Sequence, residues 1–258
     1  MRYRWEARCA HAGRWLAYML TLLGLLAWPM ARADRPPAGQ ASPLTPAKRD
    51  EMAAARHVRE AAGVVGRMVA EPRMRDLLQQ ARGIFIVPRY GRAAMLGVGA
   101  AGGAGVLLIK QKAGVWGGPA FYDLGAVSAG AQGGGEEGAI ALVLINETAV
   151  NRFTQKTAFA LTAGAGITLI DWSRRRQGAI GDGDVVIWSA ARGLYATLLA
   201  VGVSGIHYND SLTRAYYHQQ INLPDAVAGR YVNRQADALR QALAASSPGP
   251  PPGDKPSR

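Results

Sequence analysis

The chain has 258 residues, is 49% hydrophobic and carries a formal net charge of +12 at pH 7. This length is enough for one substantial domain with short additional segments. Its single cysteine, Cys9, lies before the first apolar stretch, so the rest of the chain excludes disulfides, thiolate nucleophiles and cysteine metal sites.

Residues 1–33 have the features of a secretory signal peptide. A basic segment precedes the apolar run 16–28, and Ala31-Arg32-Ala33 provides an A-x-A cleavage site. An uncleaved anchor is the alternative, although the apolar run is short for a membrane span. Residues 1–33 contain five arginines and one glutamate, so the chain from Asp34 onward keeps +8 of the total charge.

A basic exported protein meets anionic lipid headgroups, polyanionic glycans or shed nucleic acid. The alternative is that the charge merely reflects an arginine-rich proteome. Proline-rich residues 34–46 predict a flexible linker, and 246–258 predict a disordered tail. Residues 47–245 are therefore expected to form one domain.

The first element of that domain is a predicted helix over residues 47–70. Apolar residues recur at helical spacing on one face, namely Ala55, Val58, Ala62, Val65 and Val69. Arg49, Arg56 and Arg67 fall on the opposite face together with Glu60. A second short helix is predicted over 73–82, and Ile84–Val87 reads as a strand that Pro88 ends.

The middle of the chain is rich in glycine: 24 of the 123 residues from Gly83 to Gly205. Short apolar runs alternate with these glycines, which predicts antiparallel strands with bulges and close backbone contacts. The fold class is therefore α+β, with a twisted, glycine-rich antiparallel β-sheet whose bends allow a barrel-like form, and with flanking helices.

Gly97, Gly99 and Gly102 match G-x-G-x-x-G, the dinucleotide-binding fingerprint. That motif requires a helix directly after the glycines, whereas here an apolar strand and further glycines follow. The segment is better explained as part of a tightly packed sheet, and no nucleotide or other cofactor is expected.

Three later helices are predicted from caps and periodicity. Asn146 caps a helix over 147–155, Asn209 or Asp210 caps one that ends at Tyr217, and a last helix spans 225–245.

Several segments in this order resemble the SYLF domain: ARGIFIVPRYGRAAMLGVGAAGGAGVLL, WGGPAFYDLGAVSAGAQGG, INETAVNRF, TAGAGITL, DVVIWSAARGLYATLLAVGVSG and NDSLTRAYY. The resemblance covers about 50–220. One departure is His218, because the family usually has glycine after its tyrosine pair. The resemblance implies binding of anionic, phosphoinositide-like lipid headgroups. Actin binding by eukaryotic relatives is not carried over to an exported protein.

The sequence gives little support for a catalytic or a metal-binding site. No esterase elbow is present, and His207 with His218 forms no metal motif. Asp182 and Asp184 lack the remaining ligands of a calcium loop and favour a turn. Catalytic and metal-binding residues are thus expected to be absent, and an enzyme is the third-ranked class.

The candidates for lipid contact are basic. Trp172 before Arg174, Arg175 and Arg176 suits a headgroup interface, with the ring at the membrane boundary and guanidinium groups on phosphate. The remaining candidates are Arg49, Arg56, Arg67, Arg89, Arg92, Lys110 and Lys112. The alternative for these groups is an ordinary solvated surface.

The sequence thus predicts a non-enzymatic protein of the cell envelope that binds anionic phospholipid at a membrane surface. It is expected in the periplasm or outside the cell. The alternative is a structural or interaction protein that binds another envelope protein.

Overall fold

The computed structural model describes residues 44–95, 98–129, 134–161, 168–176, 183–190 and 203–246. Residues Leu44–Arg258 form one compact unit, distinct from Met1–Pro43. The predicted signal peptide and almost all of the predicted linker and tail therefore lie outside the described residues.

Eight strands form one sheet in the order β5-β8-β3-β2-β1-β4-β7-β6. The four central strands are long: β1 (Gly83–Met95), β2 (Val98–Lys110), β3 (Trp116–Ala129) and β4 (Gly134–Leu144). The outer strands are shorter: β5 (Ala158–Leu161), β6 (Leu169–Asp171), β7 (Val185–Ser189) and β8 (Val203–Tyr208). All neighbours pair antiparallel except β6 and β7, which are parallel.

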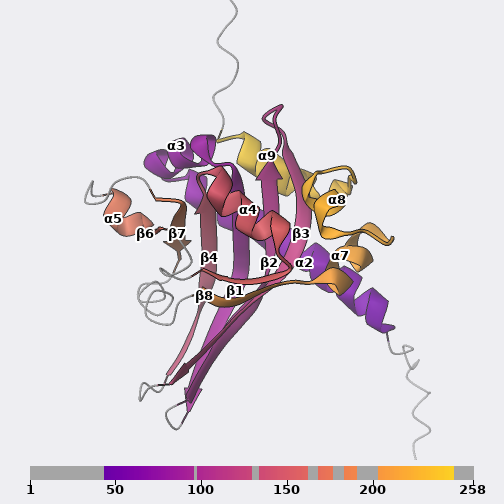
Figure 1. The fold of residues 1–258 in the computed structure, drawn as a ribbon, viewed down its shortest axis with the longest axis horizontal. Coiled ribbons are helices and arrows are strands. Elements are labelled where there is room, and N and C mark those ends of the chain that lie inside the picture. The colour runs from indigo at the N-terminus through magenta and orange to yellow at the C-terminus, as the bar shows by residue number, and fades with distance from the viewer. Residues whose placement is uncertain are drawn as a thin grey trace, which may run out of the picture. The chain divides into compact units, whose positions relative to one another are not determined.

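Helices cover both faces of this curled sheet (Figure 1). The long helix α2 (Pro46–Val69) packs across β1 and β2, beside α3 (Pro72–Gln80), α7 (Asp210–Tyr217) and α9 (Asp237–Ala244). Helix α4 (Glu147–Gln155) lies on the opposite face (Figure 1), and α8 (Leu223–Val227) packs against β3 and β2. The short α5 (Trp172–Arg176) and the 3-10 turn η2 (Arg234–Ala236) complete the described helices. The α+β class with a twisted sheet is confirmed.

Local capping explains where three of the helices begin. Thr45 accepts a hydrogen bond from the Lys48 amide at the start of α2, where Pro46 occupies the first turn. Asn146 caps α4, and Asn209, rather than Asp210, caps α7. The predicted helices in these three places are confirmed.

The buried stripe of α2 differs slightly from the prediction. It consists of Ala54, Val58, Ala61, Val64, Val65 and Met68. Ala55, Ala62 and Val69 are only half-buried, so the helix is turned slightly relative to the predicted face. Its small Ala and Val side chains let α2 lie close to the sheet.

The predicted end of the first strand is wrong. Strand β1 does not end at Pro88 but continues to Met95. Its register shifts between Ile86 and Gly91 against β2, and between Val87 and Tyr90 against β4. A bulge leaves an amide out of the ladder, so the missing N–H of proline is tolerated there.

The last predicted helix, 225–245, is divided into α8, η2 and α9. Gly229 lies between them with a φ of +68°, a left-handed conformation that ends α8.

The glycines of β2 allow close contact between strands. A Cβ at Gly105 would lie 2.4 Å from Cε2 of Phe85, and a Cβ at Gly103 would lie 2.3 Å from the Arg89 carbonyl oxygen. Gly99 and Gly102 are strand residues, Gly97 lies outside the described residues, and a strand rather than a helix follows. The interpretation of this segment as packed sheet is confirmed.

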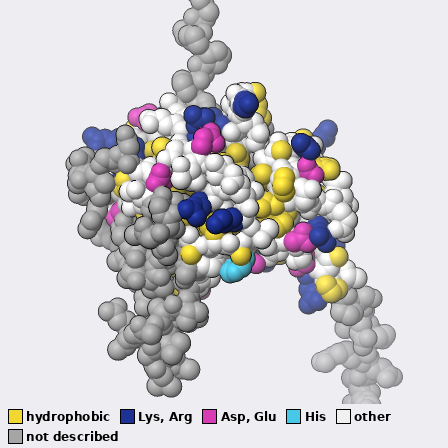
Figure 2. Space-filling view, viewed as in Figure 1, with side chains coloured by type: hydrophobic (Ala, Val, Ile, Leu, Met, Phe, Trp, Pro, Cys, Tyr) yellow, Lys and Arg dark blue, Asp and Glu magenta, His cyan; other side chains and the backbone are white. Residues whose placement is uncertain are grey.

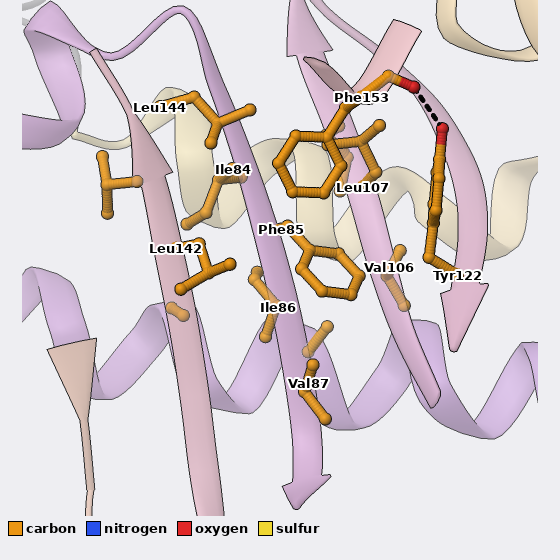
Figure 3. Close-up of a cluster of buried hydrophobic side chains, with 14 of the residues drawn as sticks. Ile84, Phe85, Ile86, Val87, Val106, Leu107, Tyr122, Leu142, Leu144 and Phe153 are labelled. Carbon is orange, nitrogen blue, oxygen red and sulfur yellow. Dashed lines mark hydrogen bonds between the residues drawn. The ribbon is translucent and has the colours of Figure 1, made fainter. Parts of the chain in front are cut away.

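Aromatic rings join α4 to the sheet (Figure 3). The Phe85 ring centroid lies 5.4 Å from that of Phe153 and 6.0 Å from that of Tyr122. The Tyr122 hydroxyl donates to the Phe153 carbonyl, so the end of α4 is fixed by a buried hydrogen bond as well as by packing.

We predict that Gly105→Ala destabilises the fold. The added methyl group collides with the buried Phe85 ring, and overpacking of this kind costs about 1–3 kcal/mol. The matched control is Gly91→Ala on β1, where a Cβ meets nothing within 4 Å. Urea denaturation should show a lower midpoint for Gly105→Ala alone; equal midpoints would show that Phe85 moves without cost.

Candidate functional site

Basic side chains follow the exposed side of α2. Arg49, Arg56 and Arg67 are all exposed, as the sequence periodicity predicts. Glu60 lies between Arg56 and Arg67 at helical spacing and is half-buried. This row of arginines is therefore accessible to an anionic partner along much of the helix.

An open cleft of about 650 Å³ lies between α2 and α7, and its lining includes Lys48, Glu51, Arg214 and His218. His218 Nε2 is 3.9 Å from Glu51 Oε1, which also pairs with Lys48 at 2.9 Å. Acidic and basic groups alternate in this cleft, so it offers little preference for an anion. His218 is the residue that departs from the SYLF pattern. It forms the C-cap of α7 and has a left-handed φ of +55°.

A second cleft, of about 570 Å³, brings two predicted residues together. It is lined by Arg67 from α2, Arg89 from β1 and the exposed Glu137 from β4, with Tyr90 and Gly91 on its other walls. Two guanidinium groups outnumber the one carboxylate of this lining, so the cleft can hold a phosphate or carboxylate group. We call this the Arg67–Arg89 cleft.

Glu60 positions one of these guanidinium groups. Arg89 Nη2 donates to Glu60 Oε1 at 2.7 Å, while the Arg89 side chain remains 76% exposed. Because arginine has five N–H donors, this ion pair leaves donors for a second anion. The ion pair therefore orients Arg89 without occupying it.

His57 lies one turn before Glu60 in α2. Burial lowers the pKa of His57 below its ordinary range, and the charge of Arg56 lowers it further. Its Nδ1 and the Oε2 of Glu60 are buried and have no hydrogen-bond partner within the described ranges. Burial thus favours a neutral imidazole beside the cleft's ion pair.

The candidates at the β2–β3 hairpin have different surroundings. Lys110 is half-buried, donates to the Gln79 carbonyl at 2.8 Å and lies 5.7 Å from the Trp116 ring centroid. Lys112 is exposed in the turn. Of Arg92, only its place in β1 is described, opposite Ala101 of β2 and Glu136 of β4.

The position of Trp172 corrects the expected interface. Its side chain is only 7% exposed, and its Nε1 donates to Glu71 Oε2 at 2.9 Å. The ring is therefore packed inside the fold rather than placed at a membrane boundary. Arg174, Arg175 and Arg176 follow within helix α5, not in a loop. Arg175 is half-buried; the side chains of Arg174 and Arg176 lie outside the described residues.

Among the exposed arginines that were not predicted as candidates, two lie where the expected helix 225–245 is interrupted. Arg230 lies between α8 and η2, and Arg234 is the first residue of η2, so the two arginines flank Tyr231 and Val232. The prediction of one continuous helix over 225–245 hid them, and Gly229 was the feature that could have revealed the loop.

Figure 2 shows basic side chains interspersed with acidic ones on the face that it presents. Within the described ranges, no three His, Cys, Asp or Glu side chains are grouped as metal ligands would be. No helix in the same part of the chain is long and apolar enough to cross a membrane.

Comparison with known families gives one match. The model for Ysc84, described as a Las17-binding protein actin regulator, matches residues 125–246. The matched region begins within β3 and continues to the end of α9, so it includes the Arg230–Arg234 segment but not α2. No curated protein matches the sequence significantly.

We predict that His57 makes the fold less stable in acid. In the unfolded chain a histidine takes up a proton near pH 6.5, whereas the half-buried His57 does so only at lower pH. The free energy of unfolding should therefore fall as pH falls below about 6.5, and level off below the folded pKa.

His57→Gln should reduce this loss of stability, as measured by urea denaturation at pH 7.5 and pH 5. The control is His207→Gln, which removes an exposed histidine from β8 by the same substitution. An unchanged pH dependence in His57→Gln would contradict the burial argument.

Proposed function

Since the chain belongs, through residues 125–246, to the Ysc84 or SYLF-domain family, we propose that it is a non-enzymatic protein that binds anionic lipid headgroups in the cell envelope. Family membership is consistent with lipid-related or actin-related binding in general. The envelope location rests on the predicted signal peptide.

The observation that carries the lipid proposal is the Arg67–Arg89 cleft. Its two guanidinium groups come from α2 and β1, two elements that pack against each other. Arginine suits phosphate because its planar donors can form two parallel hydrogen bonds. We propose that a lipid phosphate binds here, with Arg49 and Arg56 contributing attraction along α2.

The charge of the chain supports the same proposal. The sequence after the predicted cleavage site carries +8, which favours approach to an anionic surface. Headgroup contacts of exposed arginines are screened by salt, with a Debye length of about 8 Å at physiological ionic strength. Binding should therefore require anionic lipid and weaken at high salt.

The family description favours one other candidate function. The words "Las17-binding" name a protein partner of the family, so binding to an envelope protein is the alternative. The description also names actin regulation, which we do not propose for a chain with a predicted signal peptide. Vesicle binding by the purified protein, with no other protein present, separates lipid binding from this alternative.

We predict that residues 34–258, which keep the whole compact unit from Leu44, float with anionic vesicles but not with neutral ones. Arg67→Ala/Arg89→Ala should lower the vesicle partition coefficient about 30-fold, since each basic contact contributes about 1 kcal/mol near an anionic surface. Flotation should be lost in 0.5 M NaCl for the unmodified chain.

The matched control is Lys156→Ala/Arg214→Ala, which removes two charges from α4's end and α7. Equal losses in both double variants would show that net charge, rather than the cleft, binds the vesicle. Absence of flotation at low salt would overturn lipid binding as proposed and favour a protein partner.

A further inference from the structure

Four large hydrophobic side chains are exposed among the described residues: Leu44, Met52, Val115 and Val232. Leu44 is the first described residue, and Met52 lies on α2. Val115 is 62% exposed and Val232 is 75% exposed, and they lie on two loops far apart in the sequence. An exposed valine on one loop is unremarkable, but here the two loops that carry them adjoin.

The two loops are held side by side. Gln111 in the β2–β3 turn donates through Nε2 to the Val227 carbonyl at the end of α8, at 2.9 Å. A Cβ at Gly229 would lie 3.0 Å from Cα of Gly117, so the backbones are in contact where glycine leaves room. We call the paired loops, residues 111–117 and 228–234, the tip.

Each loop has a fixed shape. In the β2–β3 turn, the Gln111 amide donates to the Val115 carbonyl and the Gly114 amide to the Gln111 carbonyl, both at 2.8 Å. In the second loop, Asn233 Nδ2 donates to the Tyr216 carbonyl at 2.7 Å, and the Tyr231 ring centroid lies 6.2 Å from that of Tyr217. Tyr231 and Asn233 are thus fastened to α7, and Val232 between them remains exposed.

Cationic side chains lie on the same two loops as the valines. Lys112, Arg230 and Arg234 are exposed on the same two loops. Arg230 is paired with Asp225 at 2.8 Å and keeps 71% of its side chain exposed. Basic and hydrophobic side chains lie together at the end of the β2–β3 hairpin (Figure 2). This set of three cations, two valines and a half-buried tyrosine suits a membrane surface. Such a surface has phosphate groups on the outside and hydrocarbon beneath them.

We propose that the tip is the part of the protein that enters an anionic membrane, with Val115 and Val232 as apolar anchors and Lys112, Arg230 and Arg234 at the phosphates. This inference rests on the proposed lipid binding, and it assigns the inserting residues, which the Arg67–Arg89 cleft does not. Met52 on α2 offers a single apolar side chain, and its neighbour Glu51 is acidic.

The test uses single cysteines that carry an environment-sensitive NBD label. The chain has one cysteine, Cys9, so residues 34–258 contain none and accept Val115→Cys, Val232→Cys and the control Met52→Cys. All three sites are exposed, at 62%, 75% and 53%, so labelling should not disturb the fold. The probes are vesicles of phosphatidylcholine with 30% phosphatidylserine, with and without acyl-chain doxyl quenchers.

We expect blue-shifted emission and doxyl quenching at positions 115 and 232 but not at position 52. The unlabelled Val115→Ser/Val232→Ser variant should float about tenfold less well than the unmodified chain, whereas Met52→Ser should float equally well. Its unfolding midpoint, checked in urea, should match that of the unmodified chain because both valines are exposed.

The other outcomes separate the two proposals. Flotation with quenching at position 52 alone would overturn the tip and assign insertion to α2, while lipid binding stands. Flotation with no quenching at any position would show binding by headgroups only and would also overturn the tip. Absence of flotation would remove the proposed function and this inference with it, in favour of a protein partner at these loops.

Discussion

The contact between the Phe85 ring and Gly105 is the packing constraint on which the sheet and its two helix layers depend. The ring occupies the space that a side chain at position 105 would fill, so β1 and β2 are joined by packing as well as by their ladder. From there Phe85 reaches Phe153 and Tyr122, which fasten α4. Because alternate residues of a strand face opposite sides, the neighbours of Phe85 serve the layer that contains α2. The Phe85 ring thus holds the helix layer that contains α4. The opposite face of β1 is left for the layer that contains α2.

The same rigid sheet determines which loops can carry function. Strands β2 and β3 pair over almost their whole lengths, so the turn between them projects from a well-supported hairpin. Helix α8 packs on that hairpin, and Gly117 and Gly229 allow the two backbones to touch. Loops on a rigid scaffold can present side chains in a fixed arrangement, which an isolated flexible loop cannot do. The arrangement of the tip is therefore a consequence of the core rather than of the loops themselves.

Sequence reasoning succeeded where the determining interactions are local. The caps at Asn146 and Asn209 act on amides three residues away, and the exposure of Arg49, Arg56 and Arg67 follows from helical periodicity. It failed where residues far apart in the sequence determine the local structure. Pro88 is tolerated because a bulge coincides with it on both neighbouring strands, and local rules do not predict that register.

The candidate site shows the same division. Trp172 looked suited to an interface, but its partner Glu71 is 101 residues earlier in the chain. Lys110 is engaged by Gln79 and Trp116, and Arg89 by Glu60. Sequence patterns can select basic residues, but only the fold shows which of them already have partners and which share a cleft.

Charge and apolar contact make different demands on a protein that meets a membrane. A net positive charge attracts the whole molecule and is weakly dependent on orientation, because several exposed arginines on α2 and around the tip contribute together. Burial of apolar surface requires direct contact and so selects one orientation. The exposed valines at the tip suit this second role, since β-branched side chains have few rotamers and lose little entropy when they are buried. A chain with dispersed cations and two exposed valines on adjoining loops can therefore be attracted in many orientations and anchored in one.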